Sequence, residues 1–179
     1  MDTLATVGEL ELHLQREFAD QAAAELALAL SSGAVRAYCG WNISQEETTF
    51  EVDGDGSRLL SLPTLLLLDL VELWVDDELV DPLDTQLWPQ WSKKGQLYRR
   101  CGWKDHSVIH ARVLHGHNPV PDLVKLVALD LASKNTQNPE GLVSATVGQV
   151  SKTWAGSNTG TDNGSLPALH SRLLDRYAL

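Results

Sequence analysis

Hydrophobic residues recur at helical spacing near the start of the chain, where they predict a short first helix. Thr6 and Glu9 have the spacing of a capping box, in which each side chain satisfies a backbone N–H of the other residue. The apolar positions that follow are spaced three or four apart, as on one face of a helix: Val7, Leu10, Leu14 and Phe18.

A second helix is predicted from Asp20 to Tyr38. Asp20 is a suitable N-cap residue, and Gly40 stands where a helix is expected to stop. The many alanines permit close packing of neighbouring backbones. Its predicted buried stripe consists of Leu26, Leu30, Ala34 and Ala37.

The pattern changes between residues 48 and 115, where short apolar and alternating segments predict a run of antiparallel strands. Asp53-Gly-Asp-Gly56 is a strong turn signal of the hairpin kind. Further turns are predicted at residues 76–78 and at Lys94-Gly95, and residues 107–115 predict a longer strand rich in Val, Ile and Leu.

Helical spacing returns at Pro121, which suits a first helical turn, and the buried stripe is predicted to be Leu123, Val127 and Leu131. Residues 135–139 are expected to end this helix and residues 143–154 to be extended.

Residues 155–164 have the composition of a flexible linker. The last helix is predicted to be capped by Ser165 and to place four residues on one face: Leu166, Leu169, Leu173 and Tyr177. This helix could dock onto its own domain, which is the default, or onto a neighbour.

These elements predict an α+β fold, mainly α: a small helical bundle with an antiparallel β-hairpin region and a C-terminal helix on a flexible linker. We expect a core domain over residues 1–154, followed by the linker and helix over 155–179. A chain of 179 residues is long enough for one domain with its own core. The N-terminus does not resemble a signal peptide, and the longest apolar run, 59–75, is interrupted by Asp69 and Glu72, so no membrane partner is expected.

Charge is distributed unevenly along the chain, whose formal net charge is −10 at pH 7. Residues 1–84 hold 18 acidic and 3 basic side chains, whereas residues 85–179 hold 6 and 11. A net negative chain is not expected to coat nucleic acid by charge alone. The asymmetry fits either two solvated faces of a monomer or head-to-tail self-association.

Motifs for chemistry are weak. Four histidines, His106, His110, His115 and His117, lack companions at metal-ligand spacing, so surface and loop histidines are expected. Asp53-Gly-Asp-Gly56 resembles the start of a calcium loop but lacks the glutamate that completes one. No phosphate-binding loop or nucleophile elbow is present. We therefore expect no enzymatic activity, no metal and no cofactor.

Cys39 and Cys101, each in a Cys-Gly-Trp triplet, are expected to be reduced thiols, with a disulfide only under oxidising conditions.

The segment 88–104 interleaves tryptophans and Tyr98 with basic residues. Such a pattern can bind single-stranded nucleic acid by stacking and phosphate contacts. It is also typical of a hairpin whose aromatic side chains pack inward, and we prefer this interpretation because the remainder of the chain is acidic. The alternative function is thus a small cytosolic nucleic-acid-binding or enzymatic domain that uses this segment.

Several segments, in their order along the chain, carry a family resemblance. They are the helices up to Ala37-Tyr-Cys-Gly-Trp41 and the segments 49–63, 71–79, 95–103, 120–132, 147–154 and 166–177. Together they resemble the head-tail connector, or adaptor, family of long-tailed bacteriophages over nearly the whole chain. Leu65-Leu-Leu-Leu-Asp69 departs from the strand entry expected there.

The resemblance implies a structural virion protein of the phage neck, assembled in the cytoplasm of the host bacterium. It implies a homo-oligomeric ring, usually a dodecamer, beneath the portal protein, with a second face for a head-closure (stopper) or tail protein. Double-stranded DNA would pass through the central channel without sequence-specific binding.

Two sets of residues are candidates for contacts in such a ring. The basic candidates for the subunit interface are Lys93, Lys94, Arg99 and Arg100, and the acidic ones are Asp76, Asp77 and Glu78. The candidates for docking onto the portal are Leu166, Leu169, Leu173 and Tyr177.

Overall fold

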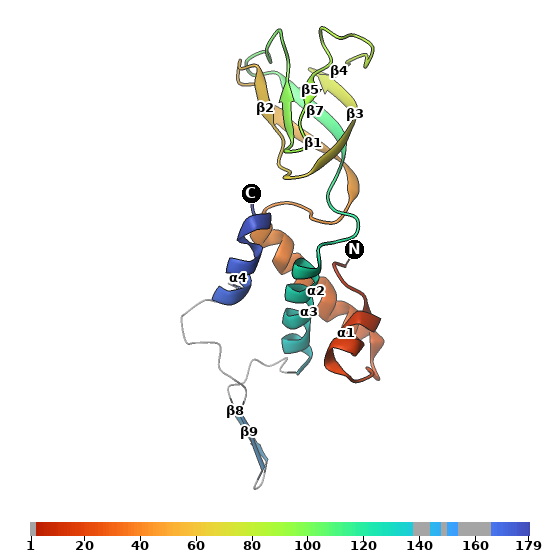
Figure 1. Cartoon of the computed structure of the whole chain (residues 1–179), viewed down its shortest axis with the longest axis vertical. Helices are drawn as coiled ribbons and strands as arrows, with labels where there is room; N and C mark the ends of the chain where they lie inside the picture. The colour runs from red at the N-terminus through yellow and green to blue at the C-terminus, as the bar shows by residue number, and fades with distance from the viewer. Residues whose placement is uncertain (1–2, 138–143, 148–149, 154–165) are drawn as a thin grey trace. The chain divides into compact units, whose positions relative to one another are not determined.

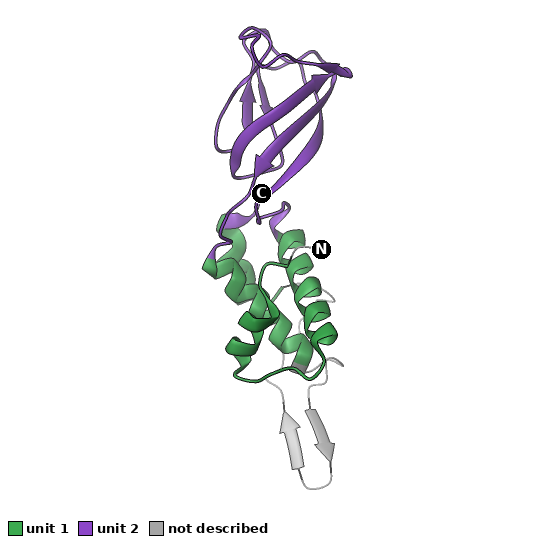
Figure 2. Cartoon of the chain, turned by 90° about the vertical axis from the view of Figure 1, so that its right-hand side faces the viewer, with its two compact units in different colours: residues 1–38, 122–176 green, residues 39–121, 177–179 purple. Residues whose placement is uncertain are grey.

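The computed structural model describes residues 3–137, 144–147, 150–153 and 166–179 (Figure 1). The chain forms two compact units, coloured separately in Figure 2. The helical unit comprises Met1–Tyr38 and Asp122–Arg176, and the β unit comprises Cys39–Pro121 and Tyr177–Leu179. The predicted α+β class is confirmed. The predicted boundary between residues 154 and 155 lies outside the described residues and stays a prediction.

Helix α1 (Val7–Leu14) forms as the capping box predicts. The Glu9 backbone N–H donates to Thr6 Oγ1 at 3.2 Å, and the Thr6 N–H donates to the Glu9 carboxylate at 2.8 Å. Leu10 is fully buried, and the other predicted apolar positions, Val7, Leu14 and Phe18, are partly buried against the same cluster.

Helix α2 (Gln21–Cys39) begins and ends as predicted: the Ala23 N–H donates to Asp20 Oδ1 at 3.1 Å, and Gly40 has a φ of +78°. The predicted buried face is wrong, however, because Leu26 and Leu30 are 61% and 60% exposed and Ala34 and Ala37 are exposed too. The buried face instead consists of Ala24, Ala27, Leu28, Ser31, Ser32, Val35 and Cys39.

Small side chains explain this choice of face. Ala24 and Ala27 belong to the same buried cluster as Leu10 of α1 and Ala132 of α3. Ser31 Oγ donates to the Ala27 carbonyl at 2.8 Å, and Ser32 Oγ accepts from the Leu4 N–H at 3.0 Å. Both hydroxyl groups are therefore satisfied while buried, which removes most of the cost of burying them.

The helical unit is completed by α3 (Asp122–Gln137) and α4 (Ala168–Leu174), which packs on α3 and continues into a 3₁₀ turn (Asp175–Tyr177). Of the predicted α3 stripe, Val127 is buried but Leu123 and Leu131 are only half-buried. Helix α4 begins after Pro167, so Ser165 is not its N-cap residue as predicted. Ser165 itself and the predicted linker 155–164 lie outside the described residues. The expected extended segment includes an antiparallel pair, β8 (Ser144–Val147) and β9 (Val150–Thr153).

The β unit contains two antiparallel sheets. The first has the order β1-β7-β3-β4, formed by β1 (Glu46–Asp53), β7 (Val108–His115), β3 (Leu67–Val75) and β4 (Glu78–Leu79). The second has the order β2-β6-β5, formed by β2 (Leu59–Ser61), β6 (Gln96–Tyr98) and β5 (Gln90–Trp91). Both sheets contribute to one core, which includes Leu60, Leu67, Leu73, Leu97, Ile109 and Val113. The β part is therefore a packed unit with its own core, larger than the predicted hairpin region.

The turn at Asp53-Gly-Asp-Gly56 does not close a hairpin, contrary to the prediction. Strand β1 pairs with β7 and β2 pairs with β6, so this turn connects two different sheets. A Cβ atom on Gly54 would collide with the Lys104 carbonyl oxygen, so glycine is required by this close approach. The other two turns are confirmed: Asp76 and Asp77, with φ of +53° and +66°, join β3 to β4, and Gly95 joins β5 to β6.

Candidate interaction surfaces

The histidines do not converge. In the part of the chain that the structure describes, no group of three or more His, Cys, Asp or Glu residues could hold a metal ion. His106 is exposed beside Asp105, and His110 is half-buried on β7 near Glu51. His115, in contrast, is 1% exposed, so the expectation of surface and loop histidines is wrong for this residue. Strand alternation directs its side chain inward, as it does Ile109 and Val113.

His115 belongs to an aromatic cluster in the β unit. Its ring centroid lies 5.1 Å from that of Phe50 and 6.2 Å from that of Trp41. Nδ1 is 3.2 Å from Thr64 Oγ1, and Nε2 is 3.6 Å from a carboxylate oxygen of Glu46. Burial lowers the pKa of His115, and the nearby Glu46 carboxylate opposes this only in part. His115 is therefore a core residue of the β unit whose environment favours the neutral form of its ring.

The tryptophans of the basic-aromatic segment 88–104 pack inward. Trp103 is 2% exposed, and Trp88 and Trp91 are partly buried against the β core. Of the aromatic residues in this segment only Tyr98, at 41%, is exposed. A platform for successive bases needs several exposed aromatic faces. The segment therefore offers little for stacking on nucleic acid.

The basic interface candidates divide into exposed and buried residues. Lys93 and Lys94 lie exposed in the β5–β6 turn, and Arg100 is exposed after β6. Arg99 is only 7% exposed, with its guanidinium 5.3 Å from the Trp103 ring centroid. Arg99 therefore packs inside its own unit, whereas the next residue, Arg100, lies on the surface.

The acidic candidates lie in the β3–β4 turn. One carboxylate oxygen of Asp76 accepts the Val108 N–H at 3.1 Å, and the other is 3.2 Å from Lys104 Nζ. The hydrogen bond from Val108 and the Lys104 ammonium hold the pKa of Asp76 below its usual range. All three acidic candidates are exposed, but only the Asp76 carboxylate has these partners, which lie at and before the start of β7.

The predicted portal-docking residues do not share one exposed face. Leu169 is 67% exposed, whereas Leu166 and Leu173 are half-buried. Tyr177 is only 8% exposed and belongs to the β unit, which includes the last three residues of the chain. The inward face of α4 consists of His170 and Leu174.

Helix α4 is fastened to α3 by His170, whose Nε2 lies 2.7 Å from an Asp130 carboxylate oxygen. Burial alone would raise the pKa of Asp130, but its ion pairs with Lys134, at 3.0 Å, and His170 bring that pKa below its ordinary value. The charged form of Asp130 therefore contributes to holding α4 in place.

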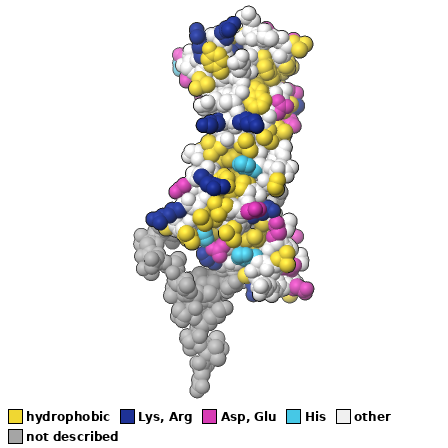
Figure 3. Space-filling model, viewed as in Figure 1, with side chains coloured by type: hydrophobic (Ala, Val, Ile, Leu, Met, Phe, Trp, Pro, Cys, Tyr) yellow, Lys and Arg dark blue, Asp and Glu magenta, His cyan; other side chains and the backbone are white. Residues whose placement is uncertain are grey.

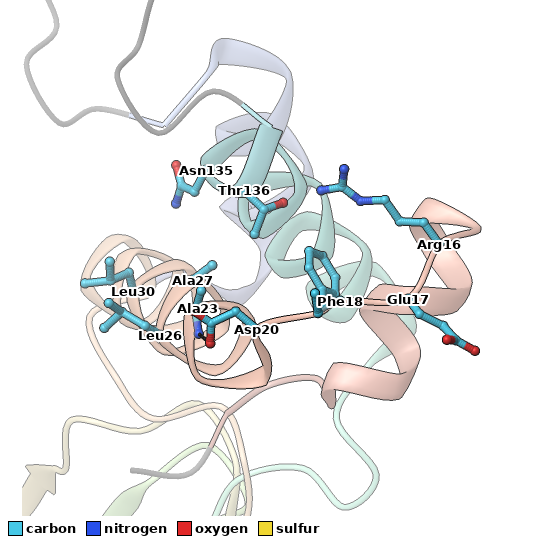
Figure 4. A pocket seen from close by; sticks show the side chains of 11 residues that line it. Arg16, Glu17, Phe18, Asp20, Ala23, Leu26, Ala27, Leu30, Asn135 and Thr136 are labelled. Atoms are coloured by element: carbon cyan, nitrogen blue, oxygen red, sulfur yellow. Dashed lines mark hydrogen bonds between the residues drawn. The ribbon is translucent and has the colours of Figure 1, made fainter.

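A hollow of about 650 Å³ in the helical unit was not foreseen from the sequence. Figure 4 shows Leu26, Leu30 and Ala23 of α2 on one side, Phe18 across from them, and Asn135 and Thr136 at the end of α3. The Arg16 guanidinium lies 5.0 Å from the Phe18 ring centroid and forms part of the wall. We call this hollow the α2 groove. Its signal in the sequence is the apolar stripe of α2, which we assigned to the core.

Exposed apolar side chains are not confined to this groove. Figure 3 shows hydrophobic side chains of the helical unit exposed between charged ones. Leucines exposed by more than two fifths of their surface include Leu12, Leu26, Leu30, Leu126 and Leu169 in this unit. Of these leucines, Leu26 and Leu30 line one hollow, and a contiguous apolar surface is the kind that marks interaction sites on soluble proteins. Among the described residues no helix is long and apolar enough to span a membrane.

The chain matches no known protein-family description, and no curated protein sequence matches it. Among solved structures, its fold is similar to that of a chain in the neck of an empty GTA particle computed with C6 symmetry. The TM-score is 0.59 at 13% sequence identity, over 98% of this chain and 89% of the other. At this identity the likeness establishes a shared fold across both units.

Proposed function

We propose that the chain is a structural protein of the neck of a tailed phage or phage-like particle. In this proposal it is a head-to-tail connector subunit that forms a ring beneath the portal, joins the capsid to the tail and lets the genome pass through its centre. The observation that carries the proposal is the shared fold with a particle-neck protein over 98% of the chain. The order of sequence segments, which resembles the connector family, supports it independently.

A ring is the assembly that such a role requires. A closed ring uses a heterologous interface, in which one surface of each subunit binds a different surface of the next. The similar chain comes from a neck computed with C6 symmetry. Rings of six or twelve identical subunits both possess a six-fold axis, so the proposed dodecamer is compatible with this symmetry.

The proposed partners are the portal protein on one side and a head-closure or tail protein on the other. DNA would pass without sequence-specific binding, because a net charge of −10 disfavours attachment to phosphate. The proposed role is not enzymatic and requires no cofactor. Its place is the virion, after assembly in the bacterial cytoplasm.

Charged turns of the β unit are the proposed contacts that set the register between subunits. Lys93, Lys94 and Arg100 remain candidates on the basic side because they are exposed, and Asp77 and Glu78 remain on the acidic side. Arg99 and Asp76 are withdrawn from this set, since both are engaged within their own β unit. Opposite charges at an interface fix orientation and partner choice more than they increase affinity.

Imaging with the portal protein of the same virus tests the proposal. The full chain and the portal protein are co-expressed and purified together, and particles are compared by electron microscopy with those of portal alone. We expect an added ring of density on one face of the portal. A chain that adds no density and instead binds single-stranded DNA as a monomer would contradict the connector and favour the nucleic-acid-binding alternative.

A further inference from the structure

The α2 groove is an apolar surface of the helical unit that the described residues leave uncovered. Leu26 and Leu30 are each about three fifths exposed there, and their neighbours across the groove are Phe18 and the end of α3. We propose that the groove receives the outer face of α4 from a second copy of the chain. This inference rests on the proposed ring and names one of its subunit contacts.

The composition of α2 is the first argument. A helix that is apolar on all sides is normally buried on all sides. Helix α2 carries one apolar face inward, with Leu28 and Val35 at or below 1% exposure, and a second one outward, at Leu26 and Leu30. The outward face is continuous with an apolar hollow rather than scattered, so a partner surface of apolar character fits it.

Charge identifies the partner surface. Glu17 and Asp20 are among the residues that line the groove, and Glu25 lies in an adjoining hollow that shares Leu26. The Glu17 carboxylate points outward, toward the solvent edge of the groove (Figure 4). Arg16, the one basic residue in the lining, is held over the Phe18 ring. The charged residues around the groove are therefore acidic on balance, and they are complementary to an apolar side chain with a basic residue beside it.

The outer face of α4 has this character. Leu169 is 67% exposed, and Arg172 is exposed one turn later. At 100° per residue these two positions lie on the side of the helix opposite His170 and Leu174. Because the inner face of α4 is already packed on its own α3, its outer face is available to another molecule.

A second copy supplies both surfaces at once. The groove and the outer face of α4 differ in shape and charge, so their contact is heterologous and can continue from subunit to subunit until a ring closes. No additional partner is needed to cover either surface.

Disulfide trapping tests the contact in the full chain. Ala23→Cys in the groove and Ala168→Cys on α4 are combined in a Cys101→Ser background, which removes the exposed native thiol. The protein is oxidised alone and with the portal protein, and each single-cysteine variant is the control. We expect the double variant to give a ladder of covalent oligomers, while each single variant gives monomers and at most dimers.

Self-association of the reduced protein provides a second measurement. Leu30→Ser is expected to weaken it about tenfold, because an apolar side chain loses its burial at the contact. Leu126→Ser is the matched control, since Leu126 is a 48% exposed leucine of α3 that does not line the groove. Circular dichroism verifies that both variants are folded.

The outcomes separate this inference from the connector proposal. Rings on the portal with no ladder from the double variant would overturn the contact and leave the connector standing. Loss of portal binding on Leu30→Ser, with the ladder absent, would assign the groove to the portal and also overturn the inference. A ladder in solution without assembly on the portal would support the contact and contradict the connector. Equal weakening by Leu126→Ser would show that the effect is not specific to the groove.

Discussion

Arg99 and Arg100 are adjacent in the chain but differ in environment, because one side chain turns into the β unit and the next turns to solvent. We expect Arg99→Ala to lower the free energy of unfolding by about 1–2 kcal/mol, through loss of the contact with the Trp103 ring and of buried side-chain surface. Arg100→Ala is the control and should change it by less than about 0.5 kcal/mol. Urea unfolding followed by tryptophan fluorescence measures both, and equal effects would contradict the assignment.

The two cysteines show the same dependence on environment, since both occur in Cys-Gly-Trp triplets but only Cys39 is buried. Burial raises the pKa of the Cys39 thiol to about 11, so little thiolate exists at neutral pH. We expect a thiol reagent at pH 7.5 to modify Cys101 quickly and Cys39 only after denaturation. Cys101→Ser should abolish the fast phase, and a fast phase that survives this substitution would show that Cys39 is accessible.

His115 gives the stability of the protein a dependence on pH. Burial lowers its pKa in the folded protein below the ordinary value of 6.5, so the unfolded chain takes up a proton first as the pH falls. Stability should therefore decrease as the pH falls from about 6.5, in a range where carboxylates remain charged. His117, whose pKa burial also lowers, contributes in the same direction.

Thermal unfolding between about pH 7.5 and 5.5 measures this effect. His115→Gln should reduce the slope of stability against pH, although it lowers stability at neutral pH. His106→Gln is the control, because the His106 side chain is 92% exposed. An unchanged slope in His115→Gln would show that other groups cause the pH dependence.

At the scale of elements, the start of α1 and both ends of α2 were predicted well because they are set by local contacts. The capping box of Thr6 and Glu9, the Asp20 cap and the stop at Gly40 each involve residues within a few positions of one another. The pairing of strands that are distant in the chain and the inward face of α2 were not predicted, since both depend on residues far away in the chain. Strand β1 pairs with β7, about 60 residues later, and the buried face of α2 was selected by small residues rather than by the largest apolar ones.

Two glycines test the difference between local effects and contacts with residues far away in the chain. Gly33 lies within α2 with nothing near the position of a Cβ atom, so Gly33→Ala should stabilise the protein by about 0.5–1 kcal/mol through helix propensity. Gly54→Ala should destabilise it by about 2 kcal/mol or more, because its Cβ would collide with the Lys104 carbonyl oxygen. Chemical denaturation measures both changes, and a neutral Gly54→Ala would mean that the 53–56 turn is easily rearranged.

At the scale of the whole molecule, the charge division along the sequence does not coincide with the two units. The helical unit contains 11 acidic and 7 basic side chains and the β unit 13 and 7, so both are net negative. The reason is that the β unit contains acidic residues from before position 84 together with the basic ones that follow it. Complementary charge is therefore found in local features, such as the β5–β6 and β3–β4 turns and the rim of the α2 groove.

Charge reversal in these two turns tests the proposed register between β units. Lys94→Glu alone and Glu78→Lys alone should each weaken ring assembly about tenfold, on the order of 1 kcal/mol, because each places like charges at the contact. Asp77 is left unchanged, since its φ of +66° favours Asp or Asn. The double variant should recover most of the loss, and raising the salt concentration should reduce all of these differences. Light scattering at several protein concentrations measures assembly, and a double variant weaker than either single one would contradict contact between these turns.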